Sequence, residues 1–97
     1  MKKFVFLYYG AWPGEPTRET MDAWTAWFAS IGENLVDGGN PFGPGREVTA
    51  GATTDLAEAS PITGYSIVNA DSMDDAEKLL VGCPIIDSVR IYEAMSM

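Results

Sequence analysis

Few side chains in this sequence are of the kinds that break bonds or transfer protons. The chain has no histidine and one cysteine, Cys83. A nucleophilic thiolate needs a histidine, a cation or a helix N-terminus beside it. Cys83 instead follows a predicted helix, whose C-terminal end disfavours negative charge. We interpret Cys83 as a small buried residue that can line a pocket, in preference to a catalytic nucleophile.

The carboxylates form no recognisable metal or catalytic motif. Asp71, Asp74 and Asp75 fall at the start of a predicted helix, where capping residues and partners of the helix dipole belong. Their spacing fits no calcium loop, and a zinc site would lack histidine ligands. Glu93, on the last predicted strand, is the carboxylate best placed to point inward, although a salt bridge or an exposed position is the favoured alternative. No metal and no cofactor is predicted.

A glycine-rich segment after the first predicted helix has the composition of a binding loop. Residues 37–42 supply a carboxylate, two glycines, the Asn40 amide and the Phe42 ring. The same residues suit a structural turn, because glycine ends helices and Asn-Pro forms turns. Both interpretations stay open for Asn40 and Phe42. The segment is not a phosphate loop, since neither glycine-rich phosphate-binding motif is present.

Aromatic side chains are the richest source of candidate ligand contacts. The first predicted helix carries Trp24, Trp27 and Phe28 at a spacing typical of a helical core face. A tryptophan that faced the interior of a barrel, as we consider for Trp24, would stack on a planar organic ligand. Tyr8, Tyr9 and Tyr65 could supply hydroxyl groups to the same cavity. The candidate ligand-binding residues are Tyr9, Trp24, Asn40, Phe42, Tyr65, Cys83 and Glu93.

Length and charge restrict the class of protein. One domain over residues 1–97 is predicted, since chains divide into several domains only at about twice this length or more. The 6 basic residues are scattered and 14 residues are acidic, for a net charge of −8. Nucleic acid and anionic membranes are therefore not expected as partners. The single cysteine fits a reducing cytoplasm, and no segment approaches the roughly 18 apolar residues of a membrane span.

The pattern of elements predicts an α+β fold. One helix begins at Thr17 and ends at Gly38-Gly39, and a second is capped by Asp71 or Ser72 and ends at Gly82. Strands are predicted over residues 4–9, 46–50, 64–70 and 88–94, and residues 53–57 are interpreted as a weaker strand that partners 46–50 across Gly51. This order is typical of a ferredoxin-like βαββαβ fold with an antiparallel sheet.

The first predicted strand is apolar on both faces, which predicts a homodimer. Val5 and Leu7 point to one face, and Phe4, Phe6 and Tyr8 point to the other. Two helices can cover only one face of a four-stranded sheet. Leaving Phe4, Phe6 and Tyr8 exposed would create a patch that monomers avoid, so a second copy is the expected cover. The alternative is that loops or the terminal residues 95–97 cover that face.

Several segments spread over nearly the whole chain carry a family resemblance: residues 6–10, 35–43, 64–68, Ala70, Ala76, 82–84 and 89–93. Taken in this order, they resemble the YCII-related proteins. The resemblance implies a homodimeric α+β barrel, in which two ferredoxin-like sheets face each other, and an activity that is mostly unassigned. Some members are thought to use a histidine on the first helix and an aspartate before a proline. Here Ala23-Trp24 and Cys83 stand nearest those places.

Three hypotheses of function follow. The leading one is a homodimer that binds a small aromatic or apolar organic molecule in a pocket of the barrel. The second is a cofactor-independent isomerase, lyase or oxygenase that relies on groups such as Tyr9, Asn40 and Glu93. The third is a protein-interaction module without a ligand.

Overall fold

A computed structural model describes residues 1–10, 17–56 and 62–96 of the chain. No helix among these residues is long and apolar enough to cross a membrane. The elements, in chain order, are β1 (Lys2–Tyr9), α1 (Arg18–Ile31), the 3-10 turn η1 (Gly32–Asn34), β2 (Leu35–Asp37), β3 (Arg46–Val48), β4 (Thr53–Asp55), β5 (Ile62–Ala70), α2 (Met73–Lys78) and β6 (Ser88–Ala94).

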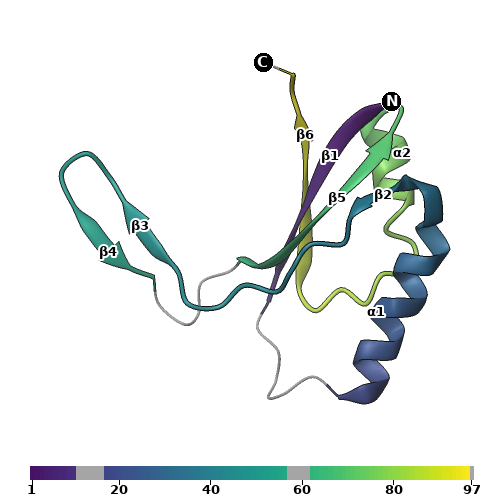
Figure 1. Cartoon of the computed structure of the whole chain (residues 1–97), viewed down its shortest axis with the longest axis horizontal. Coiled ribbons are helices and arrows are strands. Elements are labelled where there is room, and N and C mark those ends of the chain that lie inside the picture. Colours follow the sequence, from purple (N-terminus) through teal and green to yellow (C-terminus); the bar gives the residue numbers. More distant parts are fainter. Residues whose placement is uncertain (11–16, 57–61, 97) are drawn as a thin grey trace.

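A four-stranded antiparallel sheet forms the centre of the molecule, in the order β2-β5-β1-β6 (Figure 1). The α+β class and the antiparallel sheet predicted from the sequence are confirmed. Central strand β1 consists almost entirely of aromatic and branched residues, which favour a strand with neighbours on both sides. Its pairing with β5 places Phe6 beside Ser66 and Tyr8 beside Gly64 on the same face.

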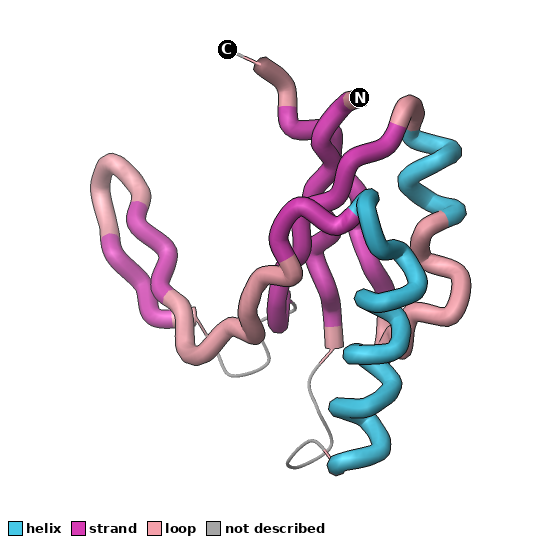
Figure 2. Tube along the Cα trace, turned by 45° about the vertical axis from the view of Figure 1, so that its right-hand side comes forward, coloured by secondary structure: helices cyan, strands magenta, loops and turns pink. Residues whose placement is uncertain are grey.

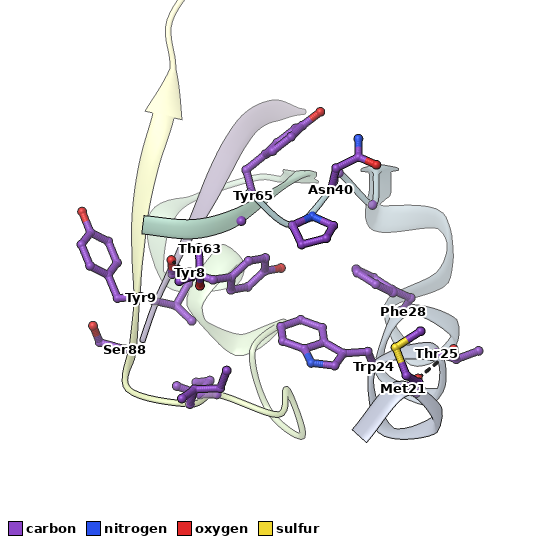
Figure 3. Close-up of a pocket in the computed structure, with 17 residues that line it drawn as sticks. Tyr8, Tyr9, Met21, Trp24, Thr25, Phe28, Asn40, Thr63, Tyr65 and Ser88 are labelled. Atoms are coloured by element: carbon purple, nitrogen blue, oxygen red, sulfur yellow. Dashed lines mark hydrogen bonds between the residues drawn. The ribbon is translucent and has the colours of Figure 1, made fainter. Parts of the chain in front are cut away.

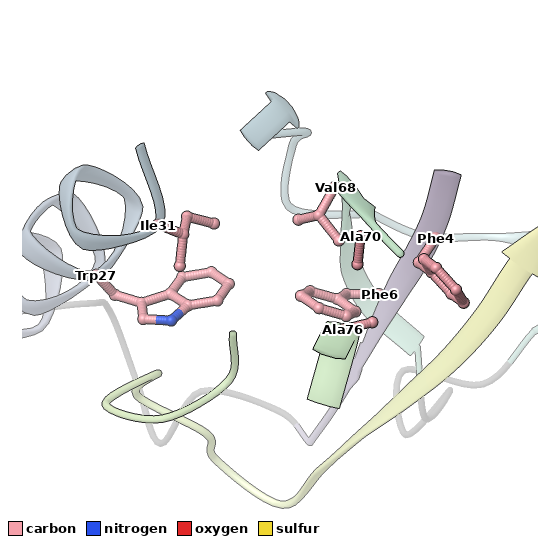
Figure 4. Packing of buried hydrophobic residues seen from close by; sticks show 7 residues of the cluster. All are labelled: Phe4, Phe6, Trp27, Ile31, Val68, Ala70 and Ala76. Atoms are coloured by element: carbon pink, nitrogen blue, oxygen red, sulfur yellow. The ribbon is translucent and has the colours of Figure 1, made fainter. Parts of the chain in front are cut away.

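Both helices lie on one face of this sheet, to the right of the strands in Figure 1 and Figure 2. The core lies between them and the sheet, where Phe4 and Phe6 are fully buried with Trp27 of α1 and Ala76 of α2 (Figure 4). Assigning the Phe4, Phe6 and Tyr8 face to a second copy is therefore wrong. The physical reason is that the small residues of β5 beside these rings leave room for the bulky side chains of α1.

The opposite face of the sheet carries Val5 and Leu7, and no helix of the described residues covers it. Both side chains are partly buried by their neighbours on the sheet, although Tyr92 of β6, paired with Val5, is 52% exposed. Ile67 of β5 also pairs with Val5 and lies on the same face. One sheet face therefore forms the core. The other, which we call the open face, carries an apolar patch bordered by Lys3 and Arg90.

Helix α1 begins as predicted and ends earlier than predicted. The Thr17 hydroxyl accepts a hydrogen bond from the Thr20 N–H at 3.2 Å, which caps the helix. The helix ends at Gly32, whose positive φ of 47° breaks the helical backbone. The predicted end at Gly38-Gly39 is wrong. Leu35 has the apolar spacing of the helix, but it packs against the core from strand β2 instead.

Strands β3 and β4 form a separate hairpin that projects away from the sheet on the side opposite the helices (Figure 1). All six of their residues are exposed, and Arg46 pairs with Asp55 at 2.9 Å. The sequence predicted two strands here, and they pair with each other. The sheet instead takes its short edge strand from β2, within the region predicted as helix. Ala57, the predicted end of the second strand, lies outside the described residues.

Helix α2 is tied to α1 by one hydrogen bond. Ser72, one of the two predicted caps, accepts a hydrogen bond from the Asp75 N–H at 3.1 Å. The Trp27 indole N–H donates to the Leu79 carbonyl at 2.8 Å, just past the end of α2. A carbonyl at the end of a helix has no partner within the helix, so this buried tryptophan satisfies a group that would otherwise lack one.

The two neighbouring tryptophans of α1 allow a matched test of this bond. Replacing Trp27 with Phe leaves the Leu79 carbonyl without its donor, which costs about 1–3 kcal/mol for a buried group. Replacing Trp24 with Phe removes an indole N–H that has no partner among the described residues. We expect urea unfolding to show a larger loss of free energy for Trp27→Phe than for Trp24→Phe. Equal losses would contradict this role of Trp27.

Candidate ligand cavity

A cavity of about 310 Å³ opens between α1 and the sheet (Figure 3). Its lining comes from α1 between residues 21 and 28, the end of β1, the starts of β5 and β6, and the two segments 38–41 and 85–86. Ligand pockets usually measure about 300–1,000 Å³, so this cavity has room for a small molecule. It lies within one chain, on the side of the sheet that the helices cover.

Three aromatic rings build the main wall of the cavity. Trp24 and Phe28 are four residues apart on α1, so they share a helical face and both point toward the sheet in Figure 3. Tyr8 meets them from β1, with its ring edge-to-face with Trp24 at a centroid distance of 4.9 Å. Trp24 also packs on Phe28 at 5.9 Å. The wall is a continuous aromatic surface, because each ring contacts the next.

A buried hydrogen-bonded chain fixes Tyr8 and the segment beside it. The Tyr8 hydroxyl donates to Ser66 Oγ at 2.8 Å, and the Ser66 hydroxyl donates to the Gly38 carbonyl at 2.7 Å. Ser66 is fully buried. The chain joins β1, β5 and the segment after β2, and it therefore holds one side of the cavity in place.

Burial raises the pKa of Tyr8 well above its ordinary value, and the nearby Cys83 adds to the rise, while the hydrogen bond with Ser66 opposes it. Tyr8 is therefore a neutral hydroxyl at physiological pH. Its proton is already donated to Ser66. Tyr8 thus serves as a packing and positioning group, and it is not a general base.

Two other hydroxyl groups of the lining, those of Thr63 and Thr25, are also engaged with the protein. Thr63 donates to the Tyr8 carbonyl at 3.3 Å, and Thr25 donates to the Met21 carbonyl at 3.0 Å. The Trp24 indole N–H is buried and has no partner within the described ranges. None of the described lining residues is Asp, Glu, Lys or Arg. The cavity therefore offers mainly carbon surface.

The structure places four of the seven sequence-predicted site residues at this cavity: Tyr9, Trp24, Asn40 and Tyr65. Trp24 forms its wall. In Figure 3, the side chains of Tyr9, Asn40 and Tyr65 point away from Trp24, so these residues border the cavity without filling it. The Tyr9 ring instead lies under the Arg90 guanidinium, 4.6 Å from the ring centroid.

The remaining three predicted site residues lie outside the cavity lining. Phe42 stacks on Tyr65 at 5.6 Å and is 47% exposed. Cys83 packs against the core, and burial raises the pKa of its thiol to about 12. Glu93 pairs with Phe4, toward the other end of β1, and lies 3.9 Å from Lys2 Nζ. Glu93 therefore takes the salt-bridge alternative considered above.

Sequence reasoning missed several residues of the lining. Ile85 and Ile86 follow Pro84 in a loop and reach the cavity, as do Thr63 of β5 and Val89 of β6. The available signal was the pair of adjacent isoleucines in a segment without helix or strand periodicity. Large apolar side chains in a loop are expected to pack against another part of the protein, because exposed apolar patches are unfavourable.

The site is thus an aromatic-walled apolar cavity without an acid–base pair in its described lining. No group of three or more His, Cys, Asp or Glu residues in the described ranges is arranged to hold a metal ion. No protein-family model, no curated protein and no solved structure matches this chain.

The hydrogen-bonded chain predicts unequal effects of removing its members. Ser66→Ala leaves both the Tyr8 hydroxyl and the Gly38 carbonyl without partners, at a cost of about 1–3 kcal/mol. Tyr8→Phe leaves Ser66 still able to donate to Gly38, and we expect a smaller loss. Urea unfolding of the two variants measures the difference. A larger loss of unfolding free energy for Tyr8→Phe would contradict the proposed order of these hydrogen bonds, from Tyr8 through Ser66 to Gly38.

Cys83 predicts a loss of stability at alkaline pH. Its pKa is about 12 in the folded chain against an ordinary value of 9.0, so above about pH 9 only the unfolded chain releases this proton. The unfolded state is then favoured as pH rises. We expect Cys83→Ala to lose stability more slowly than the parent protein between about pH 8 and pH 10, as followed by urea unfolding. If the unfolding free energies of both proteins fell equally with pH, burial would not raise the pKa of the Cys83 thiol.

Proposed function

We propose that this chain binds a small aromatic or otherwise apolar organic molecule in the cavity between α1 and the sheet. The observation that carries the proposal is a cavity of about 310 Å³ whose wall is formed by Tyr8, Trp24 and Phe28. Aromatic side chains bury a large area and stack on planar ligands. Burial of ring surface is the interaction that this lining offers.

Binding is favoured over catalysis by the state of the titratable groups. Tyr8 stays protonated because burial raises its pKa, and Cys83 is outside the lining with a raised thiol pKa. The enzyme hypothesis relied on Tyr9, Asn40 and Glu93. Tyr9 and Asn40 border the cavity, whereas Glu93 pairs with a residue toward the other end of β1. No pair of side chains in the described lining is arranged for proton transfer.

The fold proposal goes further than the α+β class. We propose that the sheet is of the ferredoxin-like type and that the chain is related to the YCII-related proteins. The order β2-β5-β1-β6 supports the first proposal, because the first and third strands of the sheet in chain order lie at its centre. The second rests on the residue resemblance given above. The free Cys83 thiol is consistent with a reducing cytoplasm, which we propose as the location.

The open face supports pairing with a second copy. Val5, Leu7, Ile67 and Tyr92 present an apolar surface there, and a second sheet would cover it in a barrel. The β3–β4 hairpin projects on the same side, and an isolated two-stranded hairpin is only marginally stable without such contacts. The open face is also what an interaction module without a ligand would use.

A thermal-shift experiment tests ligand binding. Naphthol should raise the melting temperature of the parent protein, because a ligand that binds only the folded state stabilises it. Ile86→Trp places an indole at the cavity lining and should abolish the shift. Val81→Trp adds the same group at a site that is 81% exposed and outside the lining, and it should keep the shift. A shift that survives Ile86→Trp would place the ligand elsewhere.

Analytical ultracentrifugation tests the dimer. Tyr92→Asp puts a charge on the open face, at edge strand β6, and should convert dimers to monomers. Val81→Asp adds the same charge on the loop after α2 and should leave the dimer intact. A parent protein that sediments as a monomer would contradict the pairing without affecting the cavity, which lies within one chain.

A further inference from the structure

We propose that the cavity selects uncharged aromatic molecules and rejects both anions and cations of the same shape. This inference rests on the proposed ligand-binding function and specifies the chemical class of the ligand. It is carried by the charges around the cavity, the packing of its rings and the hydrogen bonds of its hydroxyl groups.

Anions find no partner in the described lining, because it contains no Lys or Arg. Arg90 follows the lining residue Val89, but its guanidinium lies over the Tyr9 ring, which points away from Trp24 in Figure 3. A carboxylate entering the cavity would lose water and gain no charged partner in the described lining.

Cations meet a different obstacle, which is the packing of the rings. Aromatic cages hold ammonium groups by surrounding them with several ring faces, each within about 6 Å of the charge. Here the Tyr8 and Trp24 rings contact each other at 4.9 Å with an interplanar angle of 78°. Trp24 and Phe28 are likewise in contact, at 5.9 Å. These rings form one wall, so an ammonium group in the cavity would meet aromatic surface on one side only and would not be surrounded.

Three hydroxyl groups of the lining are already engaged within the protein, which disfavours polyhydroxylated ligands. Tyr8 donates to Ser66, Thr63 to the Tyr8 carbonyl and Thr25 to the Met21 carbonyl. A sugar-like ligand would have to break these bonds to use these three groups as donors. The burial of a flat carbon surface against the aromatic wall is therefore the main source of affinity.

Isothermal titration of three naphthalene derivatives tests the inference at neutral pH. Naphthol is uncharged, naphthoate is an anion and naphthylmethylammonium is a cation, and all three share one ring system. We expect naphthol to bind about tenfold or more tightly than either charged probe, since neither charge has a partner in the described lining.

A second experiment introduces a positive charge at the cavity. Met21 lines the cavity and is 58% exposed, so Met21→Arg should fold normally and supply the missing cation. Ala26→Arg adds the same charge to an exposed position of α1 outside the lining. We expect Met21→Arg to strengthen naphthoate binding at least about threefold relative to Ala26→Arg, because an opposite charge near the site favours the anion.

Each outcome decides between the claims. Tight naphthol binding with weak binding of both charged probes supports the inference. Naphthoate or the ammonium probe binding as tightly as naphthol would overturn it and leave the proposed ligand-binding function standing. Equal naphthoate affinities for Met21→Arg and Ala26→Arg would also overturn it. Binding of none of the three probes would overturn the proposed function itself.

Discussion

The structure depends on how the aromatic face of α1 packs against one face of the sheet. Trp27 lies deep in this interface, 6.3 Å from Phe6 between ring centroids, and closes the core. Trp24, one turn earlier on the helix, meets Tyr8 near the end of β1. Beyond that point the helix and the sheet do not fill the space between them, and the cavity remains. Core and cavity are thus two parts of one interface.

This packing is possible because β5 carries small residues where the helix approaches. Ser66 and Gly64 lie beside Phe6 and Tyr8 on the covered face, and neither adds bulk. Ser66 also uses its hydroxyl to hold both Tyr8 and the Gly38 carbonyl. A larger apolar residue there would fill space and lose both bonds. The position of Ser66 therefore connects the stability of the sheet to the shape of the cavity.

Local signals predicted both helices, the Thr17 cap, the pairing of the two short strands near residue 50 and every described strand except β2, which lies in the region predicted as helix. They could not predict the end of α1, because the apolar spacing continues to Leu35 although Gly32 turns the chain. They also could not decide which face of β1 the helices cover, since that choice depends on side-chain sizes on β5. Trp24 was predictable at the site from its type and spacing. Ile85 and Ile86 lie in a loop, where no periodicity marks them.

The most direct measurement of the central claim is the set of nuclear Overhauser contacts between naphthol and the labelled protein. The account predicts contacts from ligand protons to the rings of Trp24 and Phe28 and to the methyl groups of Val89, which all line the cavity. Contacts to Ile67 and Tyr92 on the open face, without contacts to Trp24, would contradict it and place the binding surface on the other side of the sheet.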